Sequence, residues 1–264
     1  MSNAASRVVV SLIGLPIVLE VVHLGGWWVF GVAGVAAAIA LHEYCLLARP
    51  LAPLAPAGHI GAMLALVGAE VGGIGWMIGG VLTTFLLAFA LKAISEARQA
   101  ATIAISGTVM GALWIGGGLA FLILLRDLPA HGELAALSVL LAVWAGDTLA
   151  YVGGRLVGRH KMAPNTSPGK TWEGFVFGTA ATIFVAFVTF YKAGFLTIGQ
   201  SIVVGVVVAI AAPAGDLFES LLKRDMDVKD TGTLLGGHGG MLDRIDALLF
   251  AAPAVYFTIL AFTG

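Results

Sequence analysis

The sequence alternates between long apolar runs and short polar breaks, and this pattern leaves few folds open to it. Hydrophobic residues make up 59% of the 264 residues and charged residues only 11%, whereas soluble domains average roughly 25% charged residues. The mean hydropathy is +0.99, and a water-soluble fold cannot bury that much apolar surface. Runs of about 20 apolar residues are what membrane-crossing helices require. We therefore expect an all-α, polytopic integral membrane protein with no sizeable soluble domain.

The polar breaks divide the chain into about nine expected transmembrane helices. The third and fourth are the shortest, and only Gly72, Gly73 and Gly75 separate them. Fused, they would form one helix of about 33 residues, roughly 50 Å long, which could cross the bilayer once only with a strong tilt. Two short spans fit better. The nine expected spans are 8–23, 27–48, 59–73, 75–91, 103–125, 134–154, 173–191, 199–222 and 245–263.

The basic residues support this division independently, because cytoplasmic loops of membrane proteins are enriched in Lys and Arg. With nine spans, only Arg126 and Lys192 of the 14 basic residues fall on one side of the membrane. The other side is expected to be the cytoplasm, with the N-terminus inside and the C-terminus outside. The two longest polar connections, 155–172 and 223–244, then face the cytoplasm. The net charge of -1 provides no basic field for nucleic acid, which is not expected as a partner.

The acidic residues divide the chain into two regions. Residues 1–130 are expected to form N-terminal transmembrane helices that act as a scaffold and offer dimer contacts, and residues 131–264 a C-terminal catalytic region. In the first region Glu20, Glu43 and Glu70 lie near predicted span ends. A snorkelling side chain or a structural hydrogen bond is the expected role of each.

Four polar residues of the eighth span recur at helical spacing. They fall at i, i+3, i+4 and i+7 and so share one helix face: Asp216, Glu219, Ser220 and Lys223. Such a face must contact protein or water, and ionisable groups at membrane depth indicate function by default. Pro213 and Gly215, one turn upstream, can weaken the backbone ladder and open room for an ion or phosphate. For the stripe alone, a polar seam that only joins helices is an equal alternative.

Two further spans carry acids at the same expected level of the membrane. Asp147 lies in the sixth span, and Asp243 and Asp246 lie at the start of the ninth. Carboxylates prefer a hard cation such as Mg2+, which usually bridges enzyme carboxylates and substrate phosphates, and no Cys or His cluster suggests zinc. Together with lysines and glycine-rich backbone, these are the parts needed for phosphoryl or nucleotidyl transfer. A covalent nucleophile at Ser220, beside Lys223, is the less favoured alternative.

The connection before the seventh span reads NTSPGKTWEG over residues 165–174. Ser167 and Thr171 offer hydroxyl groups, Lys170 offers a cation, and Gly169 allows close approach to the backbone. A loop that enters a helix N-terminus in this way suits phosphate, because free amide groups and the helix dipole point at the anion. The spacing of a P-loop is absent, so the loop alone is weak evidence.

A second connection is rich in glycine from residue 232 to residue 240 and contains His238. An anion ligand and a turn residue are both open for this histidine. Glu173 and Glu219, near the two connections, are as well explained by structural roles as by functional ones.

Residues 220–246, which read SLLKRDMDVKDTGTLLGGHGGMLDRID, resemble the signature of the phosphatidate cytidylyltransferase family, also called CDP-diacylglycerol synthases. The resemblance extends upstream through residues 147–151 and SPGKTWEG, whereas roughly the first hundred residues match in character only. Gly169 stands where the family usually has a second Lys, and Gly236 replaces a common Pro. The first departure is expected to weaken phosphate contacts and the second to loosen the loop. The signature residues present are Ser220, Lys223, Arg224, Lys229, Asp230, Gly232, His238, Gly239, Gly240, Asp243, Arg244 and Asp246.

This resemblance implies a reaction in which the phosphate of phosphatidate attacks the α-phosphorus of CTP, giving CDP-diacylglycerol and pyrophosphate for phospholipid synthesis. It also implies dependence on Mg2+, a homodimer, and a multi-pass protein of the inner (plasma) membrane with its active site at the cytoplasmic face. A second cation such as K+ is left open. Because the nucleophile is already an anion, catalysis can rest on charge neutralisation and in-line positioning.

The resemblance and the positions of the residues together give each site residue an expected role. Asp216 and Asp243 are expected to ligate the metal ion and, with Lys223 and Ser220, to form the catalytic set. The expected substrate-binding residues are Asp147, Ser167, Lys170, Thr171, Arg224, Lys229, Asp230, His238, Arg244 and Asp246.

Three other functions are weighed against this one. The nearest is CTP-dependent transfer to another membrane lipid, such as an isoprenoid alcohol or an archaeal ether lipid, which the sequence leaves open. A transporter would also carry acids within glycine-broken helices, but it does not explain two cytoplasmic glycine-rich connections. A helical scaffold would leave the acids at 147, 216 and 243 with a desolvation cost and no compensating use.

Overall fold

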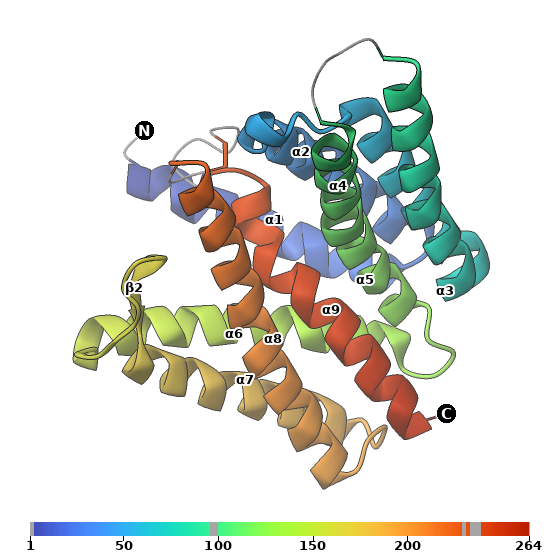
Figure 1. Cartoon of the computed structure of the whole chain (residues 1–264). Helices are drawn as coiled ribbons and strands as arrows, with labels where there is room; N and C mark the ends of the chain where they lie inside the picture. Colours follow the sequence, from blue (N-terminus) through green and yellow to red (C-terminus); the bar gives the residue numbers. More distant parts are fainter. Residues whose placement is uncertain (1–2, 96–99, 229–230, 233–238, 264) are drawn as a thin grey trace. The chain divides into compact units, whose positions relative to one another are not determined.

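The computed structural model describes residues 3–95, 100–228, 231–232 and 239–263, with side chains from Gly14 onward except Lys192. The described chain is almost entirely helical (Figure 1), which confirms the expected all-α class. The elements in order are α1 (Asn3–Leu24), α2 (Trp27–Leu47), the 3-10 turn η1 (Arg49–Leu51), α3 (Ala55–Ala93), α4 (Ala101–Gly111), the π-helical η2 (Ala112–Gly117), α5 (Gly118–Arg126), α6 (Gly132–Val157), β1 (Lys161–Ala163), β2 (Ser167–Thr171), α7 (Trp172–Lys192), α8 (Ile198–Asp225) and α9 (Leu242–Thr263).

Most of these helices have the length and composition of membrane spans. Seven helical segments of the described residues are long and apolar enough to cross a bilayer, with α4, η2 and α5 forming one of them. The protein is therefore a membrane-embedded helical protein, as expected. The count of nine spans stays a prediction.

The break expected within the third apolar stretch is confirmed at Gly73, where α3 adopts non-helical backbone angles (φ 70°, ψ -159°). Each half of α3 is roughly 27–30 Å long at 1.5 Å per residue, close to the ~30 Å hydrocarbon core. The halves pack against each other, because a Cβ at Gly68 would meet the backbone of Trp76 and a Cβ at Gly80 would meet that of Ala65. Glycine thus permits both the turn and the close helix pairing.

By internal contacts the chain divides into two units. Unit 1 comprises residues 1–127 and 225–245, and unit 2 comprises residues 128–224 and 246–264. Residues 225–245 thus group with the N-terminal helices. The predicted division at residue 130 and the roles assigned to the two predicted regions stay predictions.

In unit 1, α3 packs against α2, α4, η2 and α5. Small residues of the 107–118 stretch make this packing close: a Cβ at Gly111 would meet the ring of Tyr44, and one at Gly116 would meet Ala62. The hydroxyl of Tyr44 donates a hydrogen bond of 2.7 Å to the backbone oxygen of Gly107. A buried polar atom is thereby satisfied inside the apolar core.

In unit 2, α6 and α7 run side by side in Figure 1 and make the most extensive helix contact of the unit. Two glycines lie at this contact and have no room for a Cβ: Gly153 lies against Phe177, and Gly178 lies against Ala150. Two more glycines bring α8 close to its neighbours. Gly205 of α8 lies against Ile183 of α7, and Gly215 of α8 lies against the backbone of Asp246 in α9.

Candidate active site

The polar stripe predicted for α8 is present on one face of the helix. The Lys223 ammonium donates a hydrogen bond of 2.7 Å to Glu219 Oε2, and the Ser220 hydroxyl donates one of 3.4 Å to Asp216 Oδ1. Both contacts join residues four apart, which confirms that these side chains share a face. Glu219 is only 1% exposed. Its charge is therefore neutralised by a lysine of the same helix.

A β-hairpin brings a second lysine to this stripe. Lys170 of β2 places Nζ 2.9 Å from Asp216 Oδ2, and Arg224 Nε donates a 3.1 Å hydrogen bond to the backbone oxygen of Thr166 in the hairpin turn. The side chains of Lys170 and Asp216 are 21% and 38% exposed, but the Lys170 ammonium nitrogen itself is buried, so solvent screens this ion pair only in part. Its position is informative, because it holds a cation beside a partly exposed carboxylate.

Acids of two more helices surround the stripe. Asp246 of α9 is 8% exposed and accepts a 2.8 Å hydrogen bond from the Ala247 amide. Its carboxyl lies within electrostatic reach of Glu219 and Asp216, and Asp147 of α6 lies within reach of Asp216 and Lys170. The expected convergence of three helices is thus confirmed for the acids of unit 2. We call these residues the unit 2 cluster: Asp147, Lys170, Asp216, Glu219, Ser220, Lys223 and Asp246.

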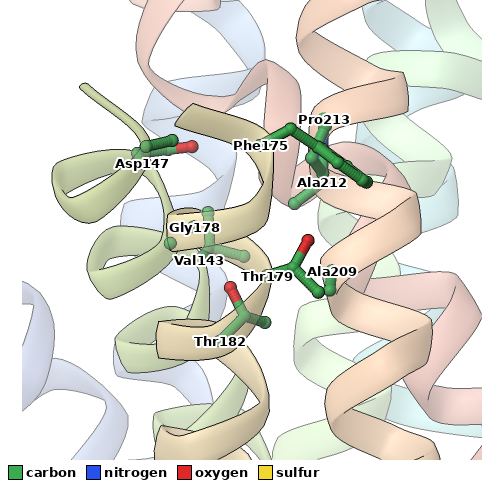
Figure 2. Close-up of a pocket in the computed structure, with 11 residues that line it drawn as sticks. Val143, Asp147, Phe175, Gly178, Thr179, Thr182, Ala209, Ala212 and Pro213 are labelled. Atoms are coloured by element: carbon green, nitrogen blue, oxygen red, sulfur yellow. The ribbon is translucent and has the colours of Figure 1, made fainter. Parts of the chain in front are cut away.

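A small cavity lies between α6, α7 and α8, with a volume of about 30 Å³. Figure 2 shows Asp147 on α6, Thr179 and Thr182 on α7 and Pro213 on α8 around this space. Ligand pockets are typically 300–1,000 Å³, so this cavity has room for one or two water molecules but not for a nucleotide. The buried hydroxyl of Thr179 has no hydrogen-bond partner among the described residues and would suit such a water. Pro213 thus borders a water-sized space, and room there for an ion or phosphate stays a prediction. Gly215 instead permits close packing of α8 on α9.

The connection predicted as a phosphate loop forms the antiparallel β-hairpin, in which Lys161 pairs with Thr171 and Ala163 with Ser167. It enters α7 as expected, because Thr171 caps that helix and its hydroxyl accepts a 3.1 Å hydrogen bond from the Gly174 amide. This contact gives Thr171 a structural task.

Glu173, in the first turn of α7, ties the helix to the segment before the hairpin. Its carboxylate accepts hydrogen bonds from the Arg159 amide, at 3.1 Å, and from His160 Nδ1, at 2.6 Å. The structural role considered for Glu173 is therefore present. A substrate role for this residue stays untested.

In unit 1, the start of α9 is held by two carboxylates. Asp243 Oδ2 accepts hydrogen bonds from the Gly240 amide (2.7 Å), the Thr231 amide (3.3 Å) and the Thr231 hydroxyl (3.0 Å). Glu43 of α2, 4% exposed, accepts hydrogen bonds from the amides of Met241 (3.0 Å) and Leu242 (2.9 Å). The structural hydrogen bond expected for Glu43 is confirmed, although its partners, almost 200 residues away, leave no signal in the sequence. We call Glu43 and Asp243 the unit 1 carboxylate pair.

Lys229, Asp230 and His238 lie outside the described residues. Arg244 is exposed in the first turn of α9. Asp216 and Asp243 belong to different units, so their joint binding of one cation stays a prediction.

The acids of the unit 2 cluster suit a hard cation by chemistry. Within the described ranges, no group of three or more His, Cys, Asp or Glu side chains is close enough together to enclose a metal ion. Mg2+ does not require such a cage, because it commonly binds one or two carboxylates and completes its shell with water and substrate phosphates. The oxygen donors of Asp216 and Asp246 therefore fit Mg2+ better than zinc, which prefers nitrogen and sulfur.

Comparison with known proteins gives extensive matches. A sequence model of the cytidylyltransferase family matches residues 5–262. A phosphatidate cytidylyltransferase of Haemophilus influenzae is 42% identical over 130 residues, about half of each protein (47% of this chain and 45% of that one). Proteins of the same name match over 96% of this chain in Synechocystis sp. (30% identity, 95% of that protein) and in Mycobacterium bovis (33% identity, 87% of that protein).

Proposed function

This chain belongs to the cytidylyltransferase family, and from that premise we propose that it transfers CMP from CTP to phosphatidate, giving CDP-diacylglycerol and pyrophosphate. The observation that carries the proposal is the family match over residues 5–262. The membrane-embedded helices support a lipid acceptor, because acyl chains leave the bilayer only at a high cost in exposed apolar surface. We propose that the lipid enters sideways between helices.

The proposed reaction is one displacement at phosphorus. An anionic oxygen of the phosphatidate phosphate forms a bond to the α-phosphorus of CTP, while the bond from that phosphorus to the bridging oxygen of the β-phosphate breaks. The bonding electrons leave with pyrophosphate. No proton has to be removed from the nucleophile, so the main obstacle is repulsion between the two anionic substrates.

Cationic side chains of the unit 2 cluster meet that requirement. Lys170 and Lys223 each hold an ammonium group beside a carboxylate, and Arg224 lies on the same helix as Lys223, bound to the hairpin turn. We propose that these groups, with Lys229 and Arg244, offset the charge of the CTP phosphates and the lipid phosphate. Substrate phosphates would compete with the carboxylates for the same cations.

We further propose that Asp216 and Asp243 hold Mg2+, as expected from the sequence. When bound, the ion would supply additional positive charge to the phosphates of CTP. Asp243 Oδ2 already accepts three hydrogen bonds, so its part in metal binding would fall to its other oxygen. Ser220 would help by orienting Asp216 through their hydrogen bond.

The membrane setting proposed for this reaction is the inner membrane, with the N-terminus and the active site at the cytoplasmic face, where CTP is found. The distribution of Lys and Arg supports that orientation. A homodimer is also proposed. Cysteine labelling from either side of the membrane, and the mass of the detergent-solubilised protein, would test these two statements.

The test of the proposed function is an acceptor comparison with purified protein. Release of pyrophosphate, the product of cytidylyl transfer, and of CDP, the product of phosphoryl transfer, would be measured from CTP in Mg2+. Phosphatidate, an isoprenoid alcohol and an archaeal ether lipid would be tested as separate acceptors. We expect pyrophosphate release with phosphatidate. With the other two acceptors the rate should be at least about 100-fold lower, because the loss of one or more charged contacts can provide that discrimination. Release that is faster with another lipid, or that requires no lipid, would contradict the proposal.

A further inference from the structure

We propose that Glu43 is a positioning residue for this reaction, which fixes the first turn of α9 and thereby the carboxylate of Asp243. The inference rests on the proposed function, because Asp243 acts at the substrate site there. Glu43 lies in the last turns of an apolar helix and outside the sequence signature. Its importance follows from its contacts in the described part of unit 1.

Glu43 binds the two backbone amides at the beginning of α9. One carboxylate oxygen accepts from Met241 and the other from Leu242, at 3.0 and 2.9 Å. The first amides of a helix have no partner within the helix, and in an apolar setting an unmade hydrogen bond of this kind is costly. A carboxylate also complements the positive end of the helix dipole. Glu43 therefore fixes both the position and the direction of the first turn.

Two glycines of the signature fit closely around this carboxylate. A Cβ at Gly232 would lie 2.7 Å from Glu43 Oε1, and a Cβ at Gly240 would lie 2.5 Å from Oε2. Neither position has room for a side chain while Glu43 is in place. The signature glycines at these two positions are thus explained by the need to approach Glu43, in addition to any contact with phosphate.

Asp243 depends on the same turn. It follows Leu242 directly, and its Oδ2 accepts hydrogen bonds from Gly240 and Thr231. The residue after Gly240, Met241, donates to Glu43. The residue after Thr231, Gly232, has no room for a Cβ beside Glu43. A shift of the first turn of α9 would move the Asp243 carboxylate with it. Residues that orient a metal ligand or a reacting group through hydrogen bonds typically affect activity about 10- to 100-fold.

The test is Glu43→Gln, which keeps the size of the side chain but replaces one acceptor oxygen by an NH2 group that faces an amide donor. We expect kcat to fall about 10- to 100-fold, with little change in the KM for CTP and with the same elution volume and melting temperature within a few degrees. Glu70→Gln is the matched control, because Glu70 is also a glutamate of an apolar helix in unit 1 and lies near the break at Gly73. It should retain wild-type activity.

A double-mutant cycle separates positioning from general destabilisation. If Glu43 acts through Asp243, Glu43→Gln lowers the activity of the wild type but causes no further loss in an Asp243→Asn background. Additive losses would overturn the inference, as would full activity of Glu43→Gln.

Amide exchange gives a readout that does not need the reaction. Hydrogen–deuterium exchange of the peptide covering residues 239–245 should be several-fold faster in Glu43→Gln and unchanged in Glu70→Gln. Equal exchange in all three proteins would overturn the anchoring of α9 by Glu43. A wild type that makes no CDP-diacylglycerol would instead overturn the proposed function, so the two failures are distinguishable.

Discussion

The acids of unit 2 and those of unit 1 are of the same residue types and lie in helices apolar enough to span a membrane, yet they bind different partners. In unit 2, Asp216 and Glu219 lie beside the ammonium groups of Lys170 and Lys223. In unit 1, Glu43 and Asp243 bind backbone amides and the Thr231 hydroxyl. A substrate phosphate can compete for the lysine side chains, whereas the amides at the start of α9 already have Glu43 as their acceptor.

This difference indicates separate tasks. Carboxylates paired with lysines hold ammonium groups for which substrate phosphates can compete. Substitution of these carboxylates should therefore reduce activity more than stability. The amide bonds of Glu43 hold the chain in place, so its substitution should first disturb local structure. The second carboxylate oxygen of Asp243 is still proposed to bind Mg2+. The desolvation cost of a buried acid is met in both cases, by a cation in one and by amide donors in the other.

The largest expected effect is that of Asp216→Asn. The change removes a negative charge from the unit 2 cluster while keeping the shape, and we expect a loss of cytidylyl transfer of about 100-fold or more with little change in melting temperature. Asp225→Asn, at the exposed end of the same helix, is the control and should remain active. Full activity of Asp216→Asn would show that this residue takes no part in the reaction. It would also contradict the functional role given to the carboxylates of the unit 2 cluster.

A smaller loss is expected for Lys170→Gln. This variant removes the ammonium group near Asp216, and activity should fall about 10- to 100-fold, the value of one hydrogen bond between charged groups. Lys161→Gln in the paired strand β1 is the matched control. The loss should appear mainly in the KM for CTP if Lys170 binds nucleotide phosphates. An equal loss in both variants would mean that only the hairpin had been disturbed.

For the unit 1 carboxylate pair the first effect should be on stability. Glu43→Ala leaves the buried amides of Met241 and Leu242 without partners, at a cost of about 1–3 kcal/mol for each. The melting temperature in detergent should fall by roughly 5 °C or more, whereas the exposed Glu20→Ala should change it little. If Glu43→Ala has the melting temperature of the wild type, Glu43 does not stabilise the start of α9, and the contrast between the two units fails for this residue.

The smallest expected effect is a gain. A Cβ at Gly169 would meet no atom within 4 Å, so Gly169→Lys can be accommodated in the exposed hairpin and restores the Lys that the family usually has there. An exposed charge contact is worth about 0.2–1 kcal/mol, which corresponds to a KM for CTP up to about fivefold lower. An unchanged KM would show that the first departure from the family pattern has no effect on nucleotide binding.

Much of the fold and part of the site could be predicted from the sequence, because their signals are local. The break at Gly73 follows from glycines between two short apolar runs, and the α8 stripe follows from helical spacing alone. The approach of Asp147, Asp216 and Asp246 could be predicted because three expected spans carry acids at the same level of the membrane.

Other features depend on contacts between distant segments and have no local signal. The β-hairpin contains strands of three and five residues, and its contacts with α8 come from Lys170 and Arg224. For Glu43 the sequence predicts a snorkelling side chain or a structural hydrogen bond, but its partners lie at the start of α9, almost 200 residues away. Periodicity also could not show that Gly215 serves helix packing.

The central claim is best tested by following the α-phosphorus of CTP. Purified protein in phosphatidate-containing nanodiscs would be given CTP labelled at that atom, with and without a chelator of divalent cations. The predicted result is label in an organic-soluble CDP-lipid, one pyrophosphate released for each lipid labelled, and no transfer when the chelator is present. Pyrophosphate release with all of the label remaining in water-soluble CMP, or undiminished transfer in the chelator, would contradict the account.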